Sequence, residues 1–117
     1  TTEIYTLSLH DALPILHNLE LCNKVYAGYE DYIKNAQIKN PIPCKVQKLP
    51  FSASDAGRFS LAGYKATMVI AFEGALAKPK NWHHSDDTPD HLEVSVMAAV
   101  FGMIKHYILN LERELNI

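Results

Sequence analysis

The stretch Ala66-Thr67-Met68-Val69-Ile70-Ala71-Phe72 decides the fold, because almost every residue in it is apolar. A short apolar run that does not alternate with polar residues predicts a strand buried on both faces of a sheet. The polar segment 73–90 follows the run, and we interpret it as a loop. Loops held on a rigid scaffold are where binding and catalysis concentrate, so this segment is the first place to look for chemistry.

A helix is predicted on either side of this strand along the chain. From about Asn18 to Ala36, apolar residues recur at helical spacing, and segment 40–43, which contains two prolines, ends the pattern. From about Val94 to Leu115 the spacing predicts a strongly amphipathic helix. The apolar positions of this second helix are Met97, Val100, Phe101, Ile104, Ile108, Leu111 and Leu115.

Two shorter elements are predicted between the first helix and the apolar strand. Residues 44–49 alternate and predict a strand near a sheet edge, since the lysines fall on one face. Residues 55–62 predict a short helix, and Gly63 supplies a left-handed stop. The order helix, strand, helix, strand, helix predicts an α/β fold.

Composition excludes some classes of protein. The chain has 117 residues, 48% of them apolar and 21% charged, with a net charge of −2, which is typical of one small globular domain. We expect no nucleic-acid partner, because no basic patch is visible. We also expect no membrane span, because no apolar run reaches 18 residues. Cys22 and Cys44 are consistent with two buried thiols or with one disulfide.

Residues 1–15 differ from the rest of the chain. The string Ser8-Leu9-His10-Asp11-Ala12-Leu13-Pro14-Ile15 looks like a translated sequencing-library adapter joined to a broken reading frame. On this interpretation the segment is non-native, and the native protein continues upstream of Leu16. The alternative is a natural N-terminal strand and turn. The segment lacks a basic start and a continuous apolar stretch, so it is no signal peptide.

The loop before the last helix carries Trp82-His83-His84-Ser85-Asp86-Asp87-Thr88-Pro89-Asp90. Imidazole is a good zinc ligand, and nearby carboxylates orient it or balance the charge of the metal. Trp82 offers an aromatic wall for a pocket. Taken alone, however, a His-His pair in a loop is more often solvated. Asp86 and Asp90 are more typical of capping or solvated residues, since Thr88-Pro89 suits the start of a helical turn.

A second polar cluster, Ser54-Asp55-Ala56-Gly57-Arg58-Phe59, opens the short predicted helix. Taken alone, Ser54 or Asp55 is best interpreted as a helix N-cap. Considered together, the two clusters indicate a resemblance to a known family. This part of the chain resembles the C-terminal part of M28-family zinc peptidases in the order of its motifs. That order is a Ser-Asp loop, a turn into an apolar strand at Ala62-Gly63-Tyr64-Lys65-Ala66, a His-Asp-Thr loop and a final long helix. The resemblance covers about residues 46–115.

The resemblance implies roles for individual residues. It implies that His83 is a zinc ligand, that Asp87 with Thr88 shapes the loop, and that Asp55, preceded by Ser54, supports the metal site or orients substrate. Trp82 would line the substrate pocket. The chain departs from the family pattern at His84, where the family often has Thr, and at Ala56, where it commonly has His.

The resemblance also implies what the chain lacks. The family site holds two zinc ions with five protein ligands and a Glu general base, and four of these ligands and the base come from upstream of the Ser-Asp loop. Residues 16–50 offer no equivalent cluster, because Glu20, Glu30 and Asp31 fall on the polar, solvent-facing side of the predicted helix. A single imidazole cannot make a zinc site. We therefore expect an inactive C-terminal fragment of a three-layer α/β/α zinc-peptidase fold.

The expected parent enzyme is an aminopeptidase acting on peptide substrates with a metal-activated water. The family is secreted or periplasmic, so the resemblance implies the same for the parent. Two alternatives stay open. One is a glutaminyl-cyclase-like acyltransferase of the same fold, which the Trp82-His83 pair fits. The other is a metal-free interaction or dimerisation domain.

Overall fold

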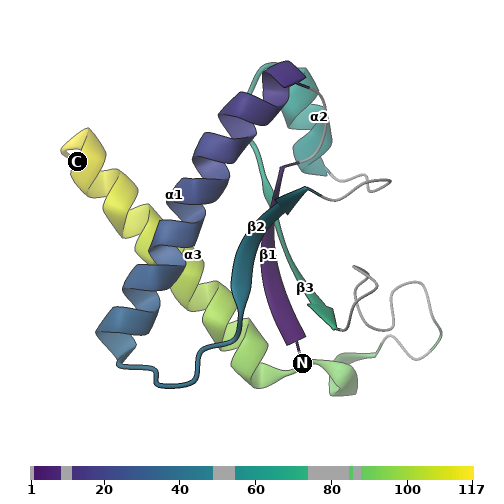
Figure 1. Cartoon of the computed structure of the whole chain (residues 1–117), viewed down its shortest axis with the longest axis vertical. Helices are drawn as coiled ribbons and strands as arrows, with labels where there is room; N and C mark the ends of the chain where they lie inside the picture. Colours follow the sequence, from purple (N-terminus) through teal and green to yellow (C-terminus); the bar gives the residue numbers. More distant parts are fainter. Residues whose placement is uncertain (1, 9–11, 49–54, 74–84, 86–87) are drawn as a thin grey trace.

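A three-stranded sheet and two long helices form the framework of the computed structural model (Figure 1). The structure describes residues 2–8, 12–48, 55–73, 85 and 88–117. The elements are, in chain order, β1 (Thr2–Ser8), α1 (Ala12–Ala36), β2 (Cys44–Lys48), α2 (Asp55–Leu61), β3 (Met68–Glu73), the 3₁₀ turn η1 (Pro89–His91) and α3 (Val94–Leu115). The predicted alternation of helices and strands from α1 to α3 is therefore confirmed, and the fold is α/β.

The sheet has the strand order β2-β1-β3. β1 runs parallel to β2 and antiparallel to β3, and its register places Ile4 opposite both Cys44 and Ala71. The prediction that the strand at 44–49 lies at a sheet edge is confirmed for the described strands. A parallel pair needs a crossover connection, and α1 supplies it between β1 and β2.

Residues 2–8 and 12–15, which lie in the segment interpreted as adapter-derived, belong to β1 and to the first turn of α1. α1 therefore begins at Ala12 rather than near Asn18. β1 is the middle strand, so the pairing of β2 with β3 in one sheet depends on it. Strand pairing does not reveal where a segment comes from, and the adapter origin stays a prediction.

The core forms where α1 and α3 cross and pack on one face of the sheet (Figure 1). Its buried side chains are Val25, Tyr29, Val96, Ala99 and Met103. Val69 and Ala71 pack against this cluster, and residues two apart on a strand share a face. The stripe of tyrosines predicted for the core is confirmed at Tyr29, which is buried, whereas Tyr26 and Tyr32 are half-buried.

The prediction that β3 is buried on both faces is wrong. Its described side chains, at residues 68–71, are all half-buried. The reason is its place in the sheet, because β3 lies at an edge of the described strands. The core cluster lies against the face that carries Val69 and Ala71. Met68 and Ile70 point to the opposite face, because side chains alternate along a strand.

The face that α3 buries also differs from the prediction. The buried residues are Val96, Ala99, Gly102 and Met103, whereas Met97 and Phe101 of the predicted apolar face are 54% and 70% exposed. Glycines explain this choice, since Gly102 leaves room for the Tyr32 ring of α1 and Gly28 of α1 lies against the α3 backbone at Met103. Among the described residues, α3 is the helix long and apolar enough to cross a membrane, by length and composition alone. The prediction of no membrane span stays untested, because core helices pass the same criterion.

Gly63 ends α2 as predicted, with φ +93°. The amide of Gly63 donates to the Ser60 carbonyl at 3.0 Å and the amide of Tyr64 donates to the Phe59 carbonyl at 3.0 Å. These two bonds define a Schellman cap, and the apolar contact that often accompanies it is the edge-on packing of Phe59 against Tyr64. The same pair of bonds closes α1 around Gln37, which also has positive φ.

Candidate functional site

Asp55 is the predicted site residue that the structure describes. It is the first residue of α2, and its side chain is exposed. A carboxylate in the first turn of a helix is stabilised by the positive end of the helix dipole. This position suits the local role of a helix-start residue, and it leaves the carboxylate open to a partner from elsewhere.

The remaining predicted site residues are Ser54, Trp82, His83 and Asp87, and all four lie outside the described residues. The same holds for His84 and Asp86. Their roles as zinc ligand, as support for the metal site and as pocket wall therefore stay predictions. The described end of this loop begins at Thr88, directly before η1.

The Thr88-Pro89-Asp90 segment forms the helical turn that the sequence predicts. Pro89 occupies the first position of η1, where a missing amide costs nothing. The Thr88 hydroxyl donates a 2.5 Å hydrogen bond to Asp90 Oδ1. This bond holds the pKa of Asp90 below its usual value, so the carboxylate stays charged. Asp90 is exposed and lies in the first turn of η1, which agrees with its capping or solvated interpretation.

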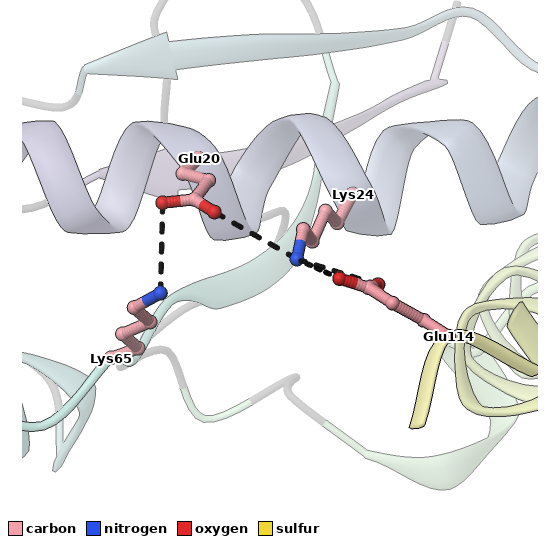
Figure 2. A network of polar contacts seen from close by, with 4 residues as sticks. All are labelled: Glu20, Lys24, Lys65 and Glu114. Atoms are coloured by element: carbon pink, nitrogen blue, oxygen red, sulfur yellow. Dashed lines mark hydrogen bonds and ion pairs between the residues drawn. The ribbon is translucent and has the colours of Figure 1, made fainter. Parts of the chain in front are cut away.

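A surface cluster of charges joins three parts of the fold (Figure 2). Lys24 Nζ on α1 lies 3.1 Å from Glu114 Oε1 on α3 and 3.7 Å from Glu20 Oε1. Lys65 Nζ, between α2 and β3, lies 3.6 Å from Glu20 Oε2. The hydrogen bond to Glu114 raises the pKa of Lys24. These side chains are solvent-exposed, so they fasten elements weakly and resemble no buried reactive site.

Sequence spacing predicts only part of this cluster. Glu20 and Lys24 are four residues apart on one helix, and their contact follows from helical geometry. The contact between Lys24 and Glu114 joins residues that are 90 positions apart in the sequence. It exists because α1 and α3 cross, and the crossing cannot be deduced from spacing within either helix.

Cys22 and Cys44 are not bonded to each other in this structure, which favours two thiols over the disulfide alternative. Cys22 is buried, and its Sγ lies 2.9 Å from Thr67 Oγ1. Burial raises the pKa of Cys44 to about 12, which keeps this thiol protonated at neutral pH. A protonated thiol is a poor nucleophile and a poor metal ligand. The thiols therefore contribute to the core rather than to a reactive site.

The described part of the chain does not make a zinc site. Within these residues, no group of three or more His, Cys, Asp or Glu side chains is placed to hold a metal ion. Three or four protein ligands are usual for zinc. His83 would therefore need ligands from outside the described residues. In comparisons with known proteins, no protein-family model, curated protein or solved structure matches this chain.

Proposed function

We propose that this chain is the C-terminal part of an M28-like zinc peptidase domain, whose intact parent is an aminopeptidase. The observation that supports the proposal most is the order of motifs along the described elements. The Ser54-Asp55 pair leads into α2, the Gly63 turn leads to β3, and the Trp82-His83 loop leads to η1 and α3. Each motif thus precedes the kind of element that the resemblance requires.

The packing of α1 and α3 on one face of β3 fits an incomplete three-layer α/β/α domain. α1 and α3 supply one layer, against the sheet face that carries Val69 and Ala71. Met68 and Ile70 on the other face stay half-exposed. A second layer of helices contributed by the rest of the parent would bury them, as both faces of such sheets are normally covered.

The chain itself should be inactive. The resemblance assigns it one zinc ligand, His83, and places the other ligands and the general base upstream. The described residues do not complete that ligand set, so no catalytic step can be assigned to them. The purified 117-residue chain should therefore release no amino acid from peptide substrates, even with added zinc. Turnover that depends on zinc and on His83 would contradict the fragment interpretation.

The test of the proposal is the native reading frame upstream of Leu16. If residues 1–15 are adapter-derived, the genomic sequence should diverge from this chain there and continue as coding sequence. That sequence should supply a His, a bridging Asp, a Glu-Glu pair and a further Asp. A frame that encodes residues 1–15 as they stand, or one without these ligands, would contradict the proposal.

A further inference from the structure

One face of α3 carries apolar residues at the spacing of a helix-pairing surface. Its residues are spaced alternately by three and four positions, which is the a/d repeat of a coiled coil. We call this set the α3 seam: Val94, Met97, Phe101, Ile104, Ile108, Leu111 and Leu115. Every seam residue is apolar, and the repeat runs the whole length of the helix from its first turn to its last.

Within the described residues the fold uses little of this seam, and Ile104 is the seam residue that packs against the core cluster. α3 buries Val96, Ala99, Gly102 and Met103, which lie on a different side of the helix. Ile104 and Leu111 are half-buried, and the other five seam residues are exposed. Phe101 and Val94 are 70% and 79% exposed. A row of large apolar side chains of this kind marks an association surface.

We propose that the α3 seam binds the α3 seam of a second copy of this chain in an antiparallel pair. The charges beside the seam specify this partner and this direction. Lys105 directly follows Ile104, and Glu112 directly follows Leu111. Ile104 and Leu111 are both d positions of the repeat, so Lys105 and Glu112 lie on the same flank of the seam, and both are exposed. When Ile104 packs on Leu115 of the second copy, Ile108 packs on Leu111. Lys105 then faces Glu112 of the second copy, and Glu112 faces its Lys105.

A parallel pair lacks this complementarity. In a parallel coiled coil, the residue after a d position faces the residue before an a position of the other helix. Lys105 would then lie beside Val100, and Glu112 beside Tyr107. The antiparallel arrangement also places Phe101 near Ile117 of the second copy, and Ile117 is 86% exposed. Two reciprocal charge pairs therefore distinguish the two directions.

The pair should be weak. Its overlap spans residues 104–115 of each helix, which is roughly 18 Å of helix at 1.5 Å per residue. A contact of this length falls at the low end of protein interfaces, where association is transient. The inference is independent of the proposed function, because it uses neither zinc nor the loop that carries His83.

Sedimentation equilibrium of the full 117-residue chain tests the inference. We expect a monomer–dimer equilibrium between about 10 µM and about 1 mM, the range of weak association. Ile108→Glu, on the seam, should weaken the dimer at least tenfold. Leu109→Glu is the matched control, since Leu109 is similarly exposed, at 37% against 47% for Ile108, but lies off the seam. Circular dichroism should show both variants folded.

Charge reversal tests the direction of pairing. Lys105→Glu should weaken the dimer about tenfold, because residue 105 of each copy would then place a negative charge opposite Glu112 of the other. The double variant Lys105→Glu/Glu112→Lys restores opposite charges at both contacts and should restore the dimer. A chain that stays monomeric up to about 1 mM, or a dimer insensitive to Ile108→Glu, would overturn the inference. A swap that restores nothing would overturn the antiparallel arrangement. Binding of the monomer to neutral lipid vesicles through the seam would overturn the proposed partner and identify a lipid surface instead.

Discussion

Gly28 of α1 lies so close to Met103 of α3 that a Cβ atom on Gly28 would be 2.7 Å from the Met103 carbonyl oxygen. The Tyr107 amide nitrogen would also be 2.7 Å away. Both neighbours are backbone atoms, so a side chain at position 28 could be accepted only if the two helices separated. This contact fixes where α1 and α3 cross, and the crossing brings Lys24 to Glu114.

Gly28→Ala should destabilise the fold by about 1–3 kcal/mol, the usual cost of forcing extra volume into a packed core. The gain in helix propensity from alanine offsets only part of this cost. Thermal unfolding followed by circular dichroism measures the effect. Asn23→Ala, at an exposed position of α1, is the control and should change stability by less than about 0.5 kcal/mol. Equal stability of both variants would contradict the close crossing.

Gly63→Ala should cost roughly 1–2 kcal/mol, because residue 63 has φ +93° and a Cβ atom penalises the left-handed region. A Cβ atom added at this residue would have no other atom within 4 Å, so the cost comes from the backbone alone. Gly63→Asn should cost less, since asparagine tolerates left-handed backbone better than alanine does. Urea unfolding of the three proteins should give a free energy of unfolding that decreases in the order Gly63, Gly63→Asn, Gly63→Ala. A Gly63→Ala variant more stable than Gly63→Asn would exclude the cap geometry.

The protein should lose stability between about pH 9 and pH 12. Burial raises the pKa of Tyr29 from 10.0 to about 12 and that of Cys44 from 9.0 to about 12. In this window the unfolded chain releases protons that the folded chain retains, so the free energy of unfolding falls as pH rises. Below pH 9 both groups are protonated in both states, and their contribution to stability is fully present. The Tyr29 hydroxyl also donates a hydrogen bond to the Ile42 carbonyl, which deprotonation would remove.

Melting temperatures measured across this window give the test. Tyr29→Phe should reduce the steepness of the decline, while lowering stability at neutral pH by about 0.5–1.5 kcal/mol through the lost hydrogen bond. Tyr64→Phe, at an exposed tyrosine, is the control and should leave the decline unchanged. If the Tyr29 variant declines as steeply as the unmodified protein, the phenol does not contribute.

Deleting residues 1–8 should lower the melting temperature by more than about 5 °C, or abolish cooperative unfolding, because β1 joins β2 to β3. A foreign origin of residues 1–15 does not alter this expectation, since the backbone amides and carbonyls that pair strands are present in a segment of any origin. An unchanged melting temperature would show that β1 does not pair natively and would favour a segment with no part in the fold.

The sequence predicts local features of this fold better than long-range ones. The role of Gly63 is predictable because a glycine after a short helix commonly adopts left-handed backbone and ends the helix. The strand at residues 44–48 is predictable because apolar and polar residues alternate clearly along it. The buried face of α3 is not, because that helix is apolar on more than one side. There the choice of face depends on the close approach of α1 and α3 at Gly28 and Gly102, which no spacing within α3 reveals.

The strand order lies beyond the sequence for a similar reason. The apolar run at 66–72 predicts burial on two faces, but its position at an edge depends on β1, whose register is set by partners far along the chain. For the candidate site, spacing places Asp55 and Thr88 correctly at the starts of α2 and η1. His83, on which the proposed function depends, lies outside the described residues.

Zinc content of the full-length parent tests the central claim most directly. The unmodified parent should bind two zinc ions per chain, as the resemblance to M28 peptidases implies. His83→Ala should lose most of this zinc, whereas His84→Ala, the adjacent imidazole that departs from the family pattern, should retain it. Metal analysis by mass spectrometry, after confirmation that each variant is folded, gives the stoichiometry. An unchanged zinc content in His83→Ala would contradict the assignment of this residue as a ligand.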